Sequence, residues 1–159
     1  HIMTNKMPLT REYAIGFITS AHEGQMYGGQ PYFTHPVAVA NNLPNSATNG
    51  EYIAALLHDV IEDTEFTEAN LRELFGNIII DMVVEVTKDD TLSYRENIQR
   101  IIDSRNLGAM KVKLSDNEIN ITGDKGNMDP VRAQKLNTRY AMSIDMLEAA
   151  IYDMEDEND

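Results

Sequence analysis

Residues 55–64 read Ala55-Leu56-Leu57-His58-Asp59-Val60-Ile61-Glu62-Asp63-Thr64, an apolar run that two pairs of ionisable residues interrupt. The surrounding periodicity predicts a helix from about Glu51 to Glu62, which is apolar on most sides and therefore buried. Buried ionisable groups cost free energy unless they are paired, hydrogen-bonded or bound to a metal ion. The segment therefore predicts a core helix that carries a polar site.

The spacing of these four residues suggests how such a site is divided. On a continuous helix His58 and Glu62 share one stripe and Asp59 and Asp63 share the next, with about 6 Å of rise between the members of each pair. His58 and Asp59 can then bind a metal ion while Glu62 and Asp63 reach one turn onward. The alternative is an ordinary salt bridge at a helix end beside two solvated carboxylates.

Two other segments favour the metal site. His35 lies in Pro31-Tyr32-Phe33-Thr34-His35-Pro36, a rigid aromatic segment, and Asp116 ends the apolar run Val112-Lys113-Leu114-Ser115-Asp116. Two imidazoles and two carboxylates suit Mn²⁺, Fe²⁺ or another octahedral divalent ion better than a closed structural zinc site. We interpret His35, His58, Asp59 and Asp116 as candidate ligands.

Helical periodicity dominates the rest of the chain, without a convincing strand pattern or two-residue hairpin. The sequence therefore predicts an all-α fold, a single helical bundle. Segment Ser93-Tyr94-Arg95-Glu96 is a capping box, and Asp129-Pro130 supplies an N-cap and a first-turn proline. The predicted helices span about residues 10–21, 36–43, 51–62, 67–76, 77–86, 93–103, 107–121 and 129–153.

Length and composition limit the function classes. A chain of 159 residues fits one domain. It has no cysteine, which excludes disulfides and thiolate metal sites and fits a cytoplasmic location. A net charge of −13 argues against a nucleic-acid partner, and no apolar run approaches the roughly 20 residues of a membrane span. We expect neither nucleic acid nor membrane as a partner, and the oligomeric state stays open.

The ends of the chain are expected to lie outside the domain. His1-Ile2 before Met3 resembles a cloning remnant, so residues 1–3 are set aside from the domain, and no secretory signal follows. Residues 4–152 are expected to form the domain. Five acidic residues fall within 153–159, which predicts a solvated, frayed acidic tail.

Several motifs in order resemble the HD-domain superfamily, specifically the hydrolase domain of RelA/SpoT-type alarmone enzymes and its small, stand-alone members of the metazoan SpoT-homologue kind. Ala21-His22-Glu23-Gly24-Gln25 with residues 31–36 is similar to the family's opening motif. Residues 56–64 are similar to its His-Asp and Glu-Asp motifs. The remaining matches are at residues 75–76, 86–88 and 113–120.

The resemblance implies an all-α bundle in which His35, His58, Asp59 and Asp116 bind one Mn²⁺ ion. It also implies that Glu62 and Asp63 position and activate the attacking water. The implied reaction removes the 3′ pyrophosphate from ppGpp or pppGpp and yields GDP or GTP. This chemistry is physically sound, because a divalent ion lowers the pKa of its bound water, and a nearby carboxylate can act as general base or acid.

Substrate contacts follow less directly from the sequence. Where the family usually carries arginine after its opening motif, this chain has Met26-Tyr27-Gly28-Gly29, and it has Asn117 and Gly123 where the family commonly has arginine and threonine. His22, the remaining native histidine, is expected to be structural. Candidates for contacts with a base or a phosphate are Tyr27, Tyr32, Lys88, Lys111, Lys113, Asn120, Lys135 and Arg139.

Three functions are therefore open. The first is a metal-dependent (p)ppGpp 3′-pyrophosphohydrolase. The second keeps the catalytic residues and changes the substrate to another nucleotide, such as the 2′-phosphate of NADPH. The third is a nucleotide-binding protein without turnover, which the complete set of candidate ligands and carboxylates argues against.

Overall fold

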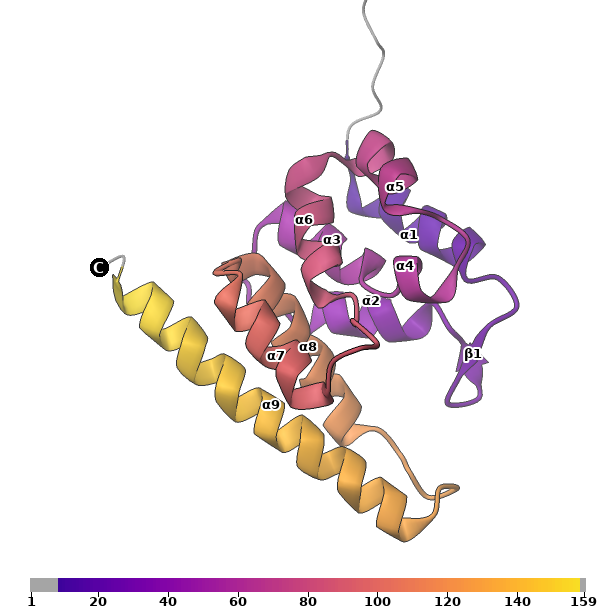
Figure 1. Cartoon of the computed structure of the whole chain (residues 1–159). Helices are drawn as coiled ribbons and strands as arrows, with labels where there is room; N and C mark the ends of the chain where they lie inside the picture. Colours follow the sequence, from indigo (N-terminus) through magenta and orange to yellow (C-terminus); the bar gives the residue numbers. More distant parts are fainter. Residues whose placement is uncertain (1–8, 158–159) are drawn as a thin grey trace, which may run out of the picture.

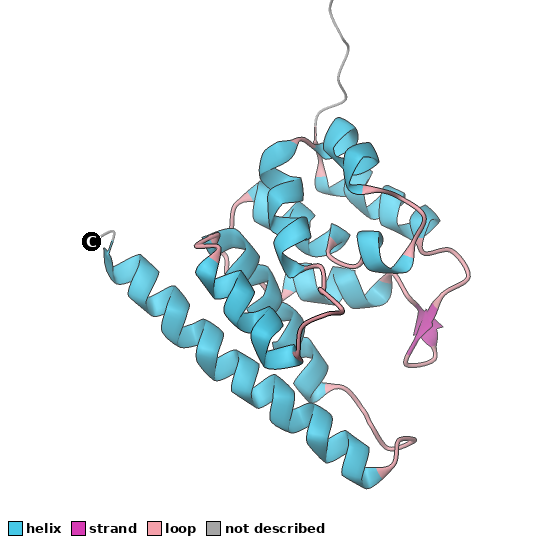
Figure 2. Ribbon diagram, in the orientation of Figure 1, coloured by secondary structure: helices cyan, strands magenta, loops and turns pink. Residues whose placement is uncertain are grey.

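The computed structural model describes residues 9–157, which form a bundle of helices and one short hairpin (Figures 1 and 2). The predicted all-α class is confirmed. In chain order the elements are α1 (Arg11–Ala21), β1 (Met26–Tyr27), β2 (Gln30–Pro31), α2 (Thr34–Asn41), α3 (Asn49–Leu57), α4 (Val60–Asp63), α5 (Glu68–Phe75), α6 (Asn77–Val86), α7 (Tyr94–Asp103), α8 (Leu107–Thr122) and α9 (Pro130–Glu157).

Helix starts are fixed by reciprocal capping. In each of three boxes, at residues 48–51, 67–70 and 93–96, a threonine or serine oxygen accepts from the backbone N–H three residues later, and that later residue's side chain accepts in return. Such caps satisfy N–H groups that have no partner within the helix. The box at Ser93 is confirmed, and α3, α5 and α7 start where the local sequence dictates.

The continuous helix predicted for residues 51–62 is wrong. Helix α3 ends at Leu57 with His58 as its C-cap, and Asp59 leaves the helical conformation at φ −104° and ψ 2° before the single turn of α4. The predicted stripes, which paired His58 with Glu62 and Asp59 with Asp63 on one continuous helix, are therefore wrong. The break lets the side chains of His58 and Asp59 approach His35 and Asp116, which lie on other helices.

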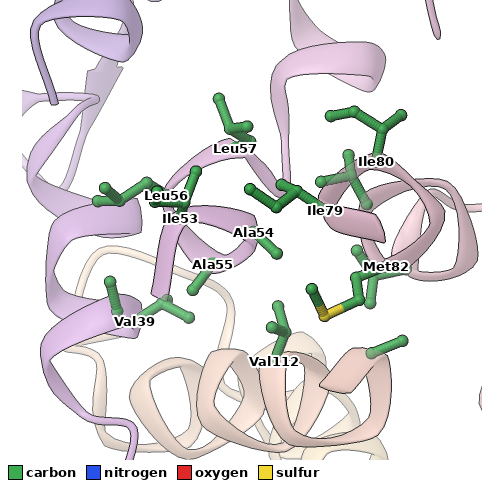
Figure 3. Close-up of a cluster of buried hydrophobic side chains, with 14 of the residues drawn as sticks. Val39, Ile53, Ala54, Ala55, Leu56, Leu57, Ile79, Ile80, Met82 and Val112 are labelled. Carbon is green, nitrogen blue, oxygen red and sulfur yellow. The ribbon is translucent and has the colours of Figure 1, made fainter. Parts of the chain in front are cut away.

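Helix α3 forms the centre of the core (Figure 3). Its residues 53–57 are fully buried, and they pack among Val39 of α2, Ile80 and Met82 of α6 and Val112 of α8. Burial of apolar area at about 25 cal/mol per Å² is the main favourable term in folding. The C-terminal end of α3, where His58 lies, is therefore held by packing on several sides.

Helix α9 lies across α7 and α8 along one side of the bundle (Figure 1). It buries Leu147 and Ile151 and reaches Glu157, which pairs with Arg105 at 2.6 Å. Residues 153–157 are thus helical, in contrast to the frayed tail that the sequence predicts. Residues 158–159 and the suggested cloning remnant at 1–3 lie outside the described residues.

A hairpin follows α1, although the sequence analysis found no strand or hairpin signal. Met26 pairs with Pro31 and Tyr27 with Gln30 in antiparallel register. Gly28 and Gly29 both have positive φ, at 56° and 79°, as a type I′ turn requires. The Gly28-Gly29 dipeptide was the signal for this turn, and the strands are too short to show any alternation.

Over residues 9–157, no helix is both long enough and apolar enough to cross a membrane.

Candidate active site

The four predicted metal ligands meet at one place. Ligand atoms of His35, His58 and Asp59 all lie within 4.8 Å of one another. Asp116 of α8 joins them, because its Oδ1 is 3.0 Å from His35 Nε2 and 3.4 Å from His58 Nε2. These residues form the metal cluster, which draws on α2, the end of α3 and α8.

The orientation and the pKa of the His58 imidazole both indicate that this cluster favours a positive charge. His58 Nδ1 lies 2.7 Å from the carbonyl oxygen of Ala55 and donates to it, so Nε2 faces Asp59 and Asp116. Nε2 is buried and makes no hydrogen bond of normal geometry. Burial lowers the pKa of His58, but the two carboxylates outweigh it and raise the pKa well above 6.5. Both observations indicate that a positive charge is favoured between these side chains.

Asp116 is held ionised despite its burial. Burial raises the pKa of Asp116, but the charges of Lys113 and His58 and a hydrogen bond from His35 lower it well below its usual range. Lys113 Nζ lies 3.2 Å from Asp116 Oδ2, and Asn120 donates to Oδ1 at 3.2 Å. The carboxylate is therefore oriented on both oxygens, as a metal ligand needs.

Tyr32 contacts Asp59, one of the candidate metal ligands. Its hydroxyl donates to Asp59 Oδ2, and burial together with the charge of Asp59 raises the pKa of Tyr32. Its ring packs 4.8 Å from that of His22. The contact places Tyr32 beside the cluster as a group that orients Asp59, and Tyr32 lines neither of the two cavities described below.

Glu62 and Asp63 flank the cluster from α4. Glu62 Oε1 accepts from the backbone N–H of Lys88 at 2.5 Å. Burial raises the pKa of both carboxyls, and the charge of Asp59 raises them further. Raised pKa values suit groups that exchange protons near neutral pH.

A hydrogen bond from the loop after α1 holds the backbone at Asp63 in place. Gln25 donates to the backbone oxygen of Asp63 at 2.8 Å, and its own amide oxygen lies 3.0 Å from His22 Nδ1. His22 is 2% exposed. Its side chain therefore packs against the loop after α1, which is a structural role as the sequence predicts.

A large cavity adjoins the His35 side of the cluster, and we call it the aromatic cavity. Its volume is about 550 Å³, and Tyr27, Asn120, Lys125 and Tyr140 line it together with His35. The Tyr27 ring lies 4.5 Å from the His35 ring, and the Tyr27 hydroxyl donates to Asn120 Oδ1 at 3.3 Å. Lys125 donates to two backbone oxygens and lies 5.7 Å from the Tyr140 ring.

A smaller cavity of about 110 Å³, here the basic cavity, adjoins the His58 side of the cluster. It shares no lining residue with the aromatic cavity. Besides apolar residues it is lined by His58, Asp59, Glu62, Lys88, Tyr94, Asn97, Arg100 and Lys113.

Besides Tyr32, three of the predicted substrate-contact residues line neither of the two cavities. Lys135 and Arg139 are exposed on α9 and line a separate shallow surface, although Arg139 also lies 6.0 Å from the Tyr94 ring. Lys111 lines neither cavity. Tyr94, Arg100, Lys125 and Tyr140 were missed by sequence reasoning, because single aromatic or basic residues on helices and loops give no site signal.

Asn117 does not face a cavity. It is fully buried between α8 and α9, and its amide donates to Ser143 Oγ at 2.5 Å. The departure from the expected arginine at this position therefore affects helix packing rather than the walls of either cavity.

Known proteins resemble this chain in sequence and in fold. A family model described as HD domain matches residues 14–112. The guanosine-3′,5′-bis(diphosphate) 3′-pyrophosphohydrolase of Haemophilus influenzae is 39% identical over 127 residues, 73% of this chain and 19% of the relative. The bifunctional (p)ppGpp synthase/hydrolase SpoT of Escherichia coli is 37% identical, with 73% and 18% covered. The chain thus spans about a fifth of the length of these curated relatives.

Solved structures share the fold. One, described as a metazoan ortholog of SpoT that hydrolyzes ppGpp, superposes with a TM-score of 0.70 at 22% identity over 99% of this chain and 98% of the other. A Listeria monocytogenes protein superposes with a TM-score of 0.57 at 26% identity, with 77% and 94% covered. With the His-Asp cluster at the end of α3 and the family match over residues 14–112, this chain belongs to the HD-domain family.

Proposed function

We propose that this chain is a Mn²⁺-dependent hydrolase that removes the 3′ pyrophosphate from guanosine 3′,5′-bis(diphosphate) and releases GDP, or GTP from the pentaphosphate. The observation that carries the proposal is the metal cluster with Glu62 and Asp63 beside it and a cavity on each side. The names of the Haemophilus and Escherichia relatives support the choice of substrate.

The ion would be held by Nε2 of His35 and His58 and by the carboxylates of Asp59 and Asp116. A mixed nitrogen and oxygen donor set suits Mn²⁺. When bound, such an ion supplies a water of lowered pKa and stabilises charge on the phosphoryl oxygens. Tyr32 fixes Asp59, and Lys113 with Asn120 fixes Asp116, so this chain orients the ligands before binding.

The reaction consumes one water. The water oxygen bonds to the phosphorus atom attached to the 3′ oxygen, and the bond between that phosphorus and the 3′ oxygen breaks. One proton of the water goes to a carboxylate and the 3′ oxygen takes up a proton, so the nucleoside product carries a hydroxyl. Glu62 and Asp63 are the carboxylates in reach of the cluster, and burial raises the pKa of each.

We assign the nucleoside to the aromatic cavity, where Tyr27 and Tyr140 offer rings and Asn120 offers an amide. Lys88 and Lys113 lie on the other side of the cluster, where phosphate charge is to be neutralised. The activity is assigned to the cytoplasm, which fits a chain without cysteine, and its charge of −13 fits a small-molecule substrate rather than nucleic acid.

A second candidate, hydrolysis of another nucleotide such as the 2′-phosphate of NADPH, is favoured by one observation. Tyr27 occupies the wall where an arginine was expected. Lys125 is the cation of the aromatic cavity among residues 9–157, and its ammonium already donates to Asn120 and Gly123 oxygens. This wall therefore offers little charge to a 5′-diphosphate.

The deciding experiment gives metal-stripped protein Mn²⁺ and, separately, ppGpp, NADPH and common nucleotides, and identifies the products by chromatography. Asp59→Ala removes a ligand, and Asp145→Ala, at an exposed position on α9, is the matched control. GDP and pyrophosphate from the wild type and the control, but not from Asp59→Ala, are the expected result. Phosphate from NADPH with none of these products would select the second candidate. Binding without any turnover would overturn both.

A further inference from the structure

Two buried polar atoms at the basic cavity have no hydrogen-bond partner among residues 9–157. They are the hydroxyl of Tyr94 and Nε of Arg100, and both residues line the cavity. A buried donor without a partner costs about 1–3 kcal/mol, so native proteins seldom keep one without reason. The proposed metal ion, bound by His58 and its neighbours, does not satisfy either atom. The cavity therefore lacks an acceptor.

The chemistry of the lining defines the missing ligand. Tyr94, Arg100 and Lys113 present hydroxyl, guanidinium and ammonium donors to one small space. Lys88 also lines the space, but its side chain is 61% exposed and its ammonium lies 3.8 Å from Asp90 Oδ1. An occupant with several oxygen acceptors and negative charge satisfies such a set, and phosphoanions have both properties. Of the acidic lining residues, Asp59 belongs to the metal cluster and Glu62 accepts from the backbone N–H of Lys88.

The guanidinium is already fixed in place. Arg100 Nη2 donates to the backbone oxygen of Thr87 at 2.7 Å and to Asn97 Oδ1 at 3.2 Å. Asn97 in turn donates to the backbone oxygens of Asp89 and Ser93 and accepts from the N–H of Asp89. Preorganised donors lose little entropy when a ligand arrives, so Nε is ready to donate.

We propose that Tyr94 and Arg100, together with Lys113, form a subsite for the 3′ pyrophosphoryl group, which the water attacks and which is released as pyrophosphate. The naming of pyrophosphate rests on the proposed function. The volume of about 110 Å³ admits a small anion, whereas the aromatic cavity of about 550 Å³ is the one with room for a nucleoside. The substrate then spans the metal cluster, with its nucleoside on the His35 side and its 3′ phosphates on the His58 side.

The test measures binding of inorganic pyrophosphate to the Mn²⁺-loaded protein by calorimetry, without turnover. Tyr94→Phe removes one hydroxyl and keeps the ring. We expect it to weaken pyrophosphate binding about tenfold, the size of one hydrogen bond to a charged acceptor, and to leave GDP binding unchanged. Its melting temperature is expected to stay equal or rise, because an unpaired buried hydroxyl is gone. If the Tyr94 hydroxyl had only a structural role, its removal would not weaken pyrophosphate binding while leaving GDP binding and the melting temperature intact.

Arg100→Gln is the second variant, with an expected loss of pyrophosphate affinity of tenfold or more. Tyr152→Phe is the matched control, since Tyr152 is 71% exposed on α9. Pyrophosphate affinity in folded Tyr94→Phe equal to that of the wild type would overturn the subsite, whatever the protein hydrolyses. If the wild type does not hydrolyse ppGpp but Tyr94→Phe and Arg100→Gln both lose affinity for pyrophosphate, the phosphoanion subsite is supported. The same result overturns the proposed function.

Discussion

The Nδ1–H of His58 donates to the carbonyl oxygen of Ala55, and this single contact decides which imidazole nitrogen faces the carboxylates. The acceptor belongs to the last turn of α3, whose residues are fully buried. The ring is therefore oriented by the hydrophobic core itself. Metal-binding histidines are commonly oriented by such a bond on their other nitrogen.

Removal of this ring is expected to abolish metal binding. His58→Ala should lower the bound Mn²⁺ from one ion per chain to near zero in elemental analysis after dialysis. In the wild type, Mn²⁺ at a hundredfold excess over its dissociation constant should stabilise the fold by about 2.7 kcal/mol, and in the variant by nothing. His22→Gln is the matched control, because His22 is also buried but contacts Gln25. Equal metal loss in the control would contradict the assignment.

Two glycines on helices are expected to respond to alanine in opposite directions. A Cβ at Gly108 would lie 2.3 Å from Met82 Sδ, inside the core, so the overpacking should cost about 1–3 kcal/mol. Gly16 is exposed within α1 and has nothing within 4 Å of a new Cβ, so alanine there should add about 0.5–1 kcal/mol. Denaturant unfolding of both variants checks the pair, and the same sign in both would refute the packing argument.

The cap at Ser93 predicts a pH dependence of stability. Hydrogen bonds from the backbone and side chain of Ser93 lower the pKa of Glu96 from 4.5. A lowered pKa in the folded state means a stabilisation that is complete above pH 4.5 and is lost as the pH falls through the folded value. Glu96→Gln retains a capping side chain without the charge.

Thermal melts of wild type and Glu96→Gln should therefore differ at pH 7, with the variant lower, and converge below pH 4.5. Glu73→Gln, an exposed change on α5, should show no such convergence. If the melting temperatures of the wild type and Glu96→Gln differ by the same amount from pH 7 to pH 4, the charge of Glu96 does not contribute to the cap.

Tyr27 is expected to limit affinity for a 5′-diphosphate. Tyr27→Arg places a guanidinium on the wall of the aromatic cavity, and one charged hydrogen bond to a phosphate should lower the KM for ppGpp about tenfold. Met26→Arg puts the same charge on the neighbouring residue, which is 63% exposed and does not line the cavity. If both variants lower KM equally, the effect is general attraction rather than a specific contact.

The sequence predicted the parts of the structure that depend on a local pattern of apolar or capping residues. The apolar run 53–57 predicted the buried α3, and Ser93 with Glu96 predicted the start of α7. The fourth candidate ligand, Asp116, followed from an apolar run that ends in a carboxylate and from the family resemblance. Each of these features can be recognised from about ten consecutive residues of the sequence.

What the sequence did not predict depends on contacts between distant segments. The helix break at His58 and Asp59 is set by partners on α2 and α8, so periodicity alone extended the helix to Glu62. Tyr94 and Arg100 lie on one amphipathic helix, α7, and only the packing of α7 brings them beside His58. No local pattern distinguishes such residues from ordinary surface positions.

His35 and Asp116 are in contact although 81 residues separate them along the chain. Closing so long a loop has an entropic cost that only the docking of α8 on α2 and α3 repays. The family match ends at residue 112, four residues before Asp116, so a fragment cut at that boundary would retain His58 and Asp59 yet lack the cluster. The complete cluster therefore exists only where α8 has docked on α2 and α3, so Mn²⁺ binding by the full chain would report that this long-range contact has formed.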